Sequence, residues 1–300
     1  MRIVIALGGN ALLRRGERPD ADVQVAHLAA AAPALAKVAE DNDVVIVHGN
    51  GPQVGLLALE SFADTSLSKP YPLSDLVAET QGVIGYWVQQ ALTNAGLSRR
   101  AVTLVTQTVV DAHDPAFNVP TKYVGTSYPE ERARQLALSS GWSVRQDGTE
   151  WRRVVPSPAP QRVLELDAAD LLLQNGVTVI LAGGGGVPVI EGPTGLKGVE
   201  AVVDKDATAA LIAIELRAEV LVMLTDVPAV YLDYGTPTQR ALHKVDAETL
   251  AGLTFPAGSM GPKVSAARHF VEITHGRAAI GSLDDTTAVV TGTSGTQIEL

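Results

Sequence analysis

Cysteine is absent from this sequence of 300 residues, and aromatic residues are scarce at 4%. Without cysteine the chain has no disulfide bond, no thiolate nucleophile and no zinc or iron–sulfur site built on thiolates. Because 46% of the residues are hydrophobic, a chain of this length can still bury a large core. That core must be built from Ala, Val, Leu and Ile.

Positive charge is also in short supply, with 23 Lys and Arg residues against 33 Asp and Glu and a net charge of −10. This balance argues against nucleic acid or an anionic membrane as the main partner. No apolar run approaches the length of a membrane span. The first run, Ile3–Leu7, ends at once in Gly8-Gly9-Asn10 and lacks the features of a signal peptide. We therefore expect a soluble cytoplasmic protein without a nucleic-acid or membrane partner.

Several well-known catalytic signatures are missing as well. The six histidines show no spacing typical of metal ligands, and no Gly-x-Ser-x-Gly elbow is present. The P-loop pattern and the dinucleotide fingerprint are absent too, which excludes a Walker-type ATPase and an ordinary NAD enzyme. His48 follows an apolar run, and we interpret it as a hydrogen-bonded structural residue. We expect no protein-held metal site.

Short β-branched runs that end in polar or Gly-rich turns recur along the chain: Ile3–Leu7, Val44–Val47, Val102–Val110, Val177–Ala182 and Val220–Leu224. Helical patterns lie between them, over Val23–Glu40, Leu73–Ala95, Asp206–Leu216 and Pro262–Ile273. This alternation predicts an α/β fold, in which a parallel sheet carries helices on both faces. The uninterrupted apolar runs are typical of strands covered on both sides.

The segment from about Asp114 to Pro160 interrupts this alternation. It contains several prolines, two tryptophans and a turn at Asp147-Gly148. Tryptophans in a loop usually need a surface to pack on, so we predict a small subdomain with a hairpin rather than a long surface loop. We expect Trp142 and Trp151 to pack within it, and the whole chain, 1–300, to form one domain with this insertion.

Three glycine-rich turns follow predicted strands: Gly8-Gly9-Asn10, Gly49-Asn50-Gly51 and Gly183–Gly186. In an open parallel sheet, ligands bind at the carboxyl ends of the strands, where backbone N–H groups favour anions. A single glycine-rich turn after a strand is often only structural and binds no ligand. Three on one sheet favour a ligand rich in anionic oxygens.

Three lysines lie beside Gly or Pro turns, two of them at predicted helix starts: Lys205, Lys263 and, in the insertion, Lys122. A cation at a helix N-terminus opposes the helix dipole, so a bound anion is a natural reason for it. The alternative for each is a solvated surface lysine. Asp204 or Asp206 is in that case an ordinary helix cap.

The sequence resembles the carbamate kinases over nearly the whole chain. The similar segments are Ala6–Leu12, His48–Gly55, Thr80–Trp87, Pro120–Lys122, Trp151–Pro158, Gly183–Gly186, Gly198–Asp206 and Gly258–Lys263. The Gly-Gly opening and the lysine-aspartate pair belong to the wider amino acid kinase superfamily, whereas Thr80–Trp87 and Trp151–Pro158 are more specific. Small departures occur at Val119 and Pro228.

The resemblance implies a three-layer α/β/α sandwich with a mainly parallel sheet of about eight strands and a small protruding subdomain. It also implies a homodimer, the use of ATP or ADP with Mg²⁺, and the reversible reaction of ATP with carbamate to ADP and carbamoyl phosphate. We expect in-line transfer without a covalent intermediate, running in the ATP-forming direction in arginine catabolism. Mg²⁺ is expected to be held mainly by phosphate oxygens and water.

The resemblance also implies roles for individual residues. Lys205 and Lys263 contact the transferring phosphoryl group and the nucleotide, Asp206 orients them, and Lys122 reaches the carbamate end. The carbamoyl phosphate end is assigned to Gly8, Gly9, Asn10, Gly49, Asn50, Gly51, Gly184 and Gly185. The nucleoside pocket is assigned to Thr225, Asp226, Val227, Tyr231 and Met260.

Two other functions remain open on the sequence. One is another small-molecule kinase of the amino acid kinase superfamily, and the other is a non-catalytic regulator that keeps the fold and binds a metabolite. Retention of all three lysines argues against the regulator.

Overall fold

The computed structural model describes residues 1–13, 16–256 and 260–300, without the side chains of Asn10 and Ala11. Its central sheet is built from β1 (Arg2–Leu7), β2 (Asp43–His48), β3 (Ala101–Thr103), β9 (Thr178–Ile180), β12 (Val220–Thr225), β15 (Lys244–Asp246), β16 (Arg277–Ser282) and β17 (Thr296–Glu299). The eight strands lie in the order β15-β17-β16-β12-β1-β2-β9-β3. All neighbours pair in parallel except β16 and β17. The predicted mainly parallel sheet is confirmed.

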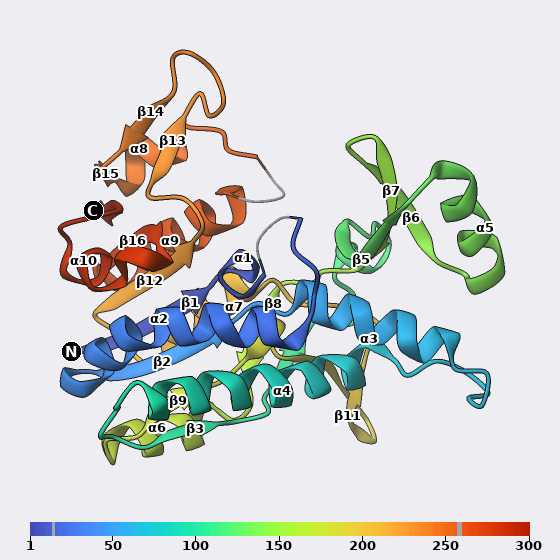
Figure 1. Ribbon diagram of the computed structural model, residues 1–300, viewed down its shortest axis with the longest axis horizontal. Coiled ribbons are helices and arrows are strands. Elements are labelled where there is room, and N and C mark those ends of the chain that lie inside the picture. The colour runs from blue at the N-terminus through green and yellow to red at the C-terminus, as the bar shows by residue number, and fades with distance from the viewer. Residues whose placement is uncertain (14–15, 257–259) are drawn as a thin grey trace.

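Helices cover both faces of this sheet (Figure 1). One face carries α2 (Ala21–Asp41), α4 (Leu73–Asn94) and α10 (Thr286–Thr291). The other carries α6 (Leu166–Gln174), α7 (Lys205–Glu215), α8 (Ala247–Ala251) and α9 (Met260–Thr274). Successive side chains of a strand point to opposite faces, so Ile3 and Ile5 pack toward α2 while Val4 packs toward α7. This explains the unbroken apolar runs and gives the expected three layers.

The run Val102–Val110, expected to be one strand, is divided between two sheets. After β3 the chain leaves the central sheet, and β4 (Gln107–Val110) joins β8 (Pro160–Val163), β10 (Val187–Gly192) and β11 (Gly195–Gly198) in the order β11-β10-β4-β8. The break falls at Thr106, whose N–H donates to Gln81 Oε1 and whose carbonyl accepts from Gln81 Nε2, both at 3.0 Å. Thr106 O also accepts from Val187 N at 2.9 Å, so a buried side chain of α4 and the start of β10 share the backbone groups at the break.

The interrupted segment forms the expected small subdomain with a hairpin. After a short turn, η1 (Pro115–Phe117), come β5 (Lys122–Tyr128), α5 (Glu130–Ser140), β6 (Ser143–Asp147) and β7 (Glu150–Val155). The strands lie in the order β5-β7-β6, and β6 and β7 are joined at Asp147–Glu150. In Figure 1 this green lobe projects beyond one end of the central layers.

The subdomain packs on α3 (Gly51–Ala63) and also buries Ala133, Leu136 and Val154 within itself. The ring centroids of Trp142 and Phe62 are 5.4 Å apart, and the guanidinium of Arg153 lies 4.9 Å from the Trp142 ring centre, so Trp142 packs within the insertion, as expected, and also on α3. Trp151 instead lies beneath the guanidinium of Arg134 at 5.1 Å. Packing on α3 thus adds to the surface that this small sheet buries against α5.

The described chain is completed by five short elements. These are α1 (Gly9–Leu12), η2 (Gly183–Gly185), η3 (Leu283–Asp285) and the hairpin of β13 (Val230–Leu232) with β14 (Arg240–Leu242).

We predict that Gly55→Ala weakens the packing of the subdomain against α3. A Cβ atom at Gly55 would lie 2.5 Å from Gly125 Cα and 2.6 Å from Gly125 N, and backbone cannot rotate away as a side chain does. Overpacking of this kind costs about 1–3 kcal/mol, which urea unfolding monitored by tryptophan fluorescence will show. The matched control is Gly192→Ala, whose nearest neighbouring atom lies at 3.7 Å and which should change stability by less than ~0.5 kcal/mol. Equal stabilities of the two variants would contradict the contact.

Candidate active site

The start of α7 is fixed by Asp204, which is its N-cap residue. Its Oδ1 accepts hydrogen bonds from the backbone N–H groups of Asp206 at 2.9 Å and Ala207 at 3.1 Å. Such a bond satisfies donors that have no partner within the helix. Asp204 is therefore the cap that the sequence left open between two aspartates. Capping at this residue places Lys205 and Asp206 in the first helical turn.

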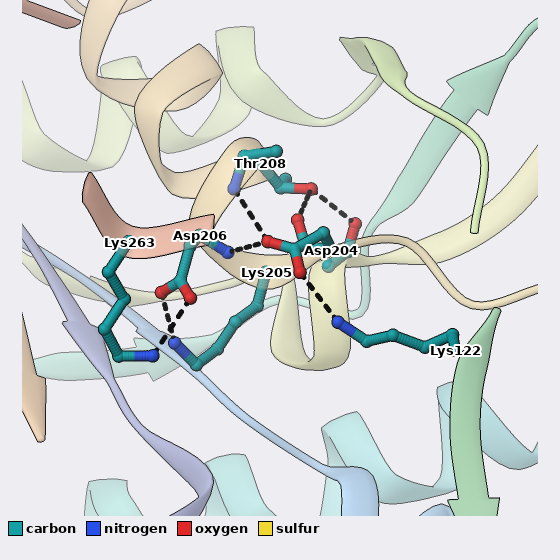
Figure 2. Close-up of polar contacts among 8 residues, drawn as sticks. Lys122, Asp204, Lys205, Asp206, Thr208 and Lys263 are labelled. Carbon is teal, nitrogen blue, oxygen red and sulfur yellow. Dashed lines mark hydrogen bonds and ion pairs between the residues drawn. The ribbon is translucent and has the colours of Figure 1, made fainter. Parts of the chain in front are cut away.

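Asp206 lies between two lysines that are 58 residues apart in sequence (Figure 2). Its Oδ1 accepts from Lys205 Nζ at 2.5 Å and its Oδ2 from Lys263 Nζ at 3.1 Å. Only 6% of its side chain is exposed, against 12% for Lys205 and 13% for Lys263. The buried group keeps one net positive charge in a chain whose overall charge is −10.

The ionisation of this group follows from its geometry. Burial acts to raise the pKa of Asp206, but the ammonium groups of Lys205 and Lys263 outweigh it and lower the pKa to about 2. Burial also lowers the pKa of Lys205, while Asp206 opposes this effect. A carboxylate with so low a pKa is a poor proton acceptor at neutral pH. Asp206 therefore suits orientation of the lysines rather than general-base catalysis.

Lys122, the first residue of β5, reaches the same place from the subdomain. Its Nζ donates to Asp204 Oδ2 at 2.7 Å, and Figure 2 shows it on the far side of Asp204 from Lys263. Burial acts to raise the pKa of Asp204, yet the Lys122 ammonium and the hydrogen bonds it accepts hold it below its ordinary value. The structure thus brings all three predicted lysines to one helix start. Asp204 joins the subdomain to α7.

The first two glycine turns lie against each other and against Lys205. A Cβ atom at Gly49 would lie 3.0 Å from Gly9 N and 3.5 Å from Lys205 Cε. Gly8 N donates to Leu224 O at 2.8 Å, which joins the turn after β1 to the end of β12. The carboxyl ends of β1, β2 and β12 therefore meet at the lysines, as expected for an open parallel sheet.

Two asparagines were expected among the binding groups. The side-chain nitrogen of Asn50, which is 6% exposed, donates to Thr80 Oγ1 at 2.9 Å, so this amide group supports the turn from within. The side chain of Asn10 lies outside the described residues. Gly51 opens α3 and is exposed.

The turn Gly183–Gly186 is buried beneath the other two. A Cβ atom at Gly184 would lie 2.1 Å from Asn50 Nδ2, and one at Gly185 would lie 2.6 Å from Val203 O. The carbonyl of Gly185 accepts from Thr108 at 2.7 Å and from Thr208, in the first turns of α7, at 3.1 Å. The structure therefore gives Gly184 and Gly185 a packing role under Asn50 and the α7 start. Direct contact with a substrate stays a prediction for both.

The residues expected to line the nucleoside pocket come from the end of β12 and the turn after it, from β13 and from the start of α9. Thr225 ends β12 next to Gly8 and donates to Asp226 Oδ1 at 3.1 Å, while Val227 is half-buried. Tyr231 of β13 lies 5.9 Å from Tyr234, ring to ring. Met260 begins α9 one turn before Lys263 and packs on the core. Gly258 and Ser259 lie outside the described residues.

The sequence missed the buried polar groups that hold this edge together. They are Thr80, Gln81, Thr106, Thr108 and Thr208. No motif marks such residues, although Thr80 and Gln81 lie in Thr80–Trp87, one of the more specific segments of the sequence. His48 makes a hydrogen bond, as expected: its Nδ1–H donates to Gly49 O at 3.0 Å, and the residue is 1% exposed.

No group of three or more His, Asp or Glu side chains in residues 1–13, 16–256 and 260–300 could hold a metal ion. None of the helices within those ranges is long and apolar enough to cross a membrane.

Comparison with known proteins gives a consistent result. The sequence profile of the amino acid kinase family matches residues 1–281. Carbamate kinase of Haemophilus influenzae is 49% identical over 300 residues, covering 99% of this chain and 96% of the relative, and that of Rhizobium meliloti is 48% identical over 302 residues, covering 99% and 93%. The structure of carbamate kinase from Giardia lamblia bound to AMP-PNP superposes with a TM-score of 0.91 at 39% identity, covering 99% and 98%.

We predict that His48 makes the fold sensitive to acid. Burial, with the nearby Lys205 charge, lowers the pKa of His48 from 6.5 to about 4, against the raising effect of its bond to Gly49. Between these values the unfolded chain binds a proton that the folded chain does not, so stability is full above pH 6.5 and falls as the pH drops. The loss attributable to His48 should reach about 2 kcal/mol at pH 5.

Urea unfolding at pH 7 and pH 5 measures this loss. The free energy of unfolding should differ less between pH 7 and pH 5 in His48→Gln than in the wild type, by about that amount, because glutamine does not titrate. His113→Gln, at an exposed histidine, is the control and should leave the difference unchanged. If the wild type and His48→Gln lose the same stability between pH 7 and pH 5, His48 is not the group that makes the fold sensitive to acid.

Proposed function

The chain belongs to the carbamate kinases of the amino acid kinase family, and we propose that it transfers a phosphoryl group reversibly between ATP and carbamate. The observation that carries the proposal is the convergence of Lys122, Lys205 and Lys263 on the start of α7. The direction that we propose is ATP formation from carbamoyl phosphate and ADP, as in arginine catabolism, in the cytoplasm.

The chemistry needs charge and position more than acid–base catalysis. Carbamate is an anion, so its oxygen attacks the γ-phosphorus while the bond to the bridging oxygen of ADP breaks, in line and without a phosphoenzyme. No proton has to be removed from the attacking oxygen, which agrees with the low pKa of Asp206. The catalytic contribution then comes from alignment and from neutralising the phosphoryl oxygens.

Each site residue has a proposed place in this reaction. Lys205 and Lys263, held by Asp206, neutralise the transferring phosphoryl group and the nucleotide phosphates. The backbone amides of the Gly8–Asn10 and Gly49–Gly51 turns, which lie against Lys205, bind the carbamoyl phosphate end. Because Asp206 already fixes both ammonium groups, little reorganisation is needed when the charge shifts during transfer.

The nucleotide is proposed to lie along the end of β12, against Thr225, Asp226, Val227, Tyr231 and Met260. The described residues offer no carboxylate cluster for a metal ion. A Mg²⁺ ion would therefore be held mainly by phosphate oxygens and water and would supply further charge neutralisation. AMP-PNP in the Giardia relative supports a nucleotide site in this fold.

Lys122 is proposed to change partners during turnover. With no substrate present, its ammonium is paired with Asp204. A phosphoryl or carbamate oxygen near the glycine turns competes for the same ammonium, and the subdomain that carries Lys122 then acts as a lid over the acceptor. Excluding water prevents loss of the phosphoryl group to hydrolysis and strengthens the local electrostatics.

We also propose a two-fold homodimer that uses α4. Ile84 and Leu92 of this helix are fully buried in the core, but Val83 and Tyr86 remain 37% and 54% exposed. A closed dimer would cover the apolar remainder. Two alternatives to the enzymatic proposal stand: a related kinase with another acceptor, and a metabolite-binding regulator.

The decisive experiment is coupled ATP formation from carbamoyl phosphate and ADP, with Lys205→Ala as the test variant. We expect turnover in the wild type and a loss of ~10²–10³ in kcat in the variant, because one charge-stabilising contact of a phosphoryl transfer has about that value. Lys197→Ala, at an exposed lysine of β11, should retain full activity.

The alternatives give other results in the same assay. A folded wild-type protein without turnover indicates a regulator, and transfer to another carboxylate or phosphate acceptor alone indicates a different kinase. Near-normal kcat in a folded Lys205→Ala protein would remove this residue from the mechanism.

We predict that Lys122→Ala impairs transfer to carbamate while ADP binding, measured by calorimetry, stays nearly unchanged. The reason is that Lys122 comes from the subdomain and meets only the acceptor end. Hydrogen exchange in residues 114–160 should slow when substrates bind to the wild type. Arg145→Ala, an exposed basic residue of the same subdomain, is the control. Full activity of Lys122→Ala together with unchanged hydrogen exchange would show that the subdomain is a fixed structural element and not a lid.

A further inference from the structure

An open cavity lies at the end of β1 opposite to the lysines. It has a volume of about 660 Å³ and is lined by the start of β1, the end of β8, α6 and the end of α7. β1 runs from Arg2 at the cavity to Leu7 at the candidate active site, and α7 runs from Lys205 to Glu215 in the other direction. With a rise of 1.5 Å per residue, the 11 residues of α7 separate the two sites by roughly 16 Å.

The lining of this cavity carries six charged side chains whose formal charges cancel. They are Arg2, Arg162, Arg217, Asp167, Asp170 and Glu215. Pockets of several hundred Å³ with a few convergent polar groups are typical of small-ligand sites. A neutral sum gives a multivalent anion such as phosphate, or a polyamine, no net attraction. A molecule that carries both signs finds a partner for each.

Part of this charge is used by the fold itself. Arg2 Nη1 lies 2.8 Å from Asp170 Oδ1 and donates to Leu216 O, at the end of α7, at 2.9 Å. Gln174 Nε2 donates to Asp170 Oδ2 at 2.7 Å. These contacts join β1, α6 and α7 and build the wall of the cavity.

The other charged groups are available for a ligand. Within the described ranges, the side chains of Asp167, Glu215 and Arg217 are exposed to solvent and make no hydrogen bond or ion pair. Arg162 pairs with Glu191 at 2.8 Å, but both side chains are more than half exposed, at 53% and 59%. A surface pair of this kind contributes only ~0–1 kcal/mol and exchanges easily.

Among the described residues, the two neighbouring free carboxylates, Glu215 and Asp167, lack a close cation. Burial raises the pKa of Glu215 and the neighbouring Asp167 adds to it, although Arg162 opposes the shift. A cation placed beside Glu215 would relieve this. Arg217 follows the end of α7 with a φ of +52°, because α7 ends in a Schellman turn, in which Arg217 N donates to Ile214 O at 3.0 Å and Ala218 N to Ala213 O at 2.8 Å. This turn directs the chain past the cavity at Arg217.

We propose that this cavity binds a small zwitterion that carries an ammonium and a carboxylate group, the chemical class of free amino acids. The ammonium group lies toward Glu215 and Asp167, and the carboxylate group toward Arg217 and Arg162. Because α7 has one end in this cavity and the other at Lys205, binding stiffens the helix that carries the catalytic lysine.

Calorimetry tests binding with three probes of different net charge: L-lysine, L-glutamate and glycine. We expect at least one of them to bind with a millimolar or lower Kd, and acetate, methylammonium and inorganic phosphate, which carry one sign of charge only, to bind at least ten-fold more weakly. Arg217→Gln and Glu215→Gln should each weaken the bound probe at least ten-fold. Arg240→Gln and Glu248→Gln, at exposed residues of β14 and α8, are the matched charge controls and should not.

Hydrogen exchange is the second measurement, because it does not depend on turnover. The bound probe should slow exchange in residues 205–217 of the wild type and not in Arg217→Gln. Absence of binding heat for all three zwitterions up to ~10 mM would overturn the proposal, as would equal binding of phosphate or undiminished binding to both variants. Since none of these measurements involves carbamoyl phosphate, failure of the proposed enzymatic function would leave this result untouched.

Discussion

The site depends on one arrangement, a buried carboxylate shared by two lysines. Removing Asp206 from its partners would leave two ammonium groups largely out of water, and breaking a buried ion pair on one side typically costs about 3–5 kcal/mol. With Asp206 in place, the lysines are fixed and the group still holds one excess positive charge. A protein that repels anions overall thus keeps a small region that attracts them.

The start of α7 converts this arrangement into a connected site. The cap at Asp204 sets the direction in which Lys205 and Asp206 point, and the other oxygen of the same carboxylate binds Lys122. One side chain therefore ends a helix and holds the subdomain. Beneath it, the turn Gly183–Gly186 allows Val203 and Asn50 to approach closer than any side chain would permit.

The subdomain combines two kinds of attachment. On the side of α3 it is held by the contact of Gly55 with Gly125 and by the rings of Trp142 and Phe62. On the side of the site it is held by the Lys122–Asp204 pair, in which the lysine side chain is 40% exposed. Apolar packing against α3 does not compete with an anionic substrate, whereas the ion pair does. In the proposed reaction, an anionic substrate would change the second attachment and leave the first in place.

The sequence by itself determined the α/β class, the main strands and helices, and the residue types of the site. Hydrophobic period and glycine turns are local signals, and Lys122, Lys205 and Lys263 stand beside such turns. Tertiary structure alone decided that Val102–Val110 divides at Thr106, because the Gln81 side chain of α4 forms hydrogen bonds with the backbone there. It also decided that Trp142 packs on Phe62, that Gly184 and Gly185 lie beneath the site, and that Asp204 pairs with Lys122. These contacts join residues far apart in the chain, and no local pattern records which distant group will fill a given space or accept a given proton.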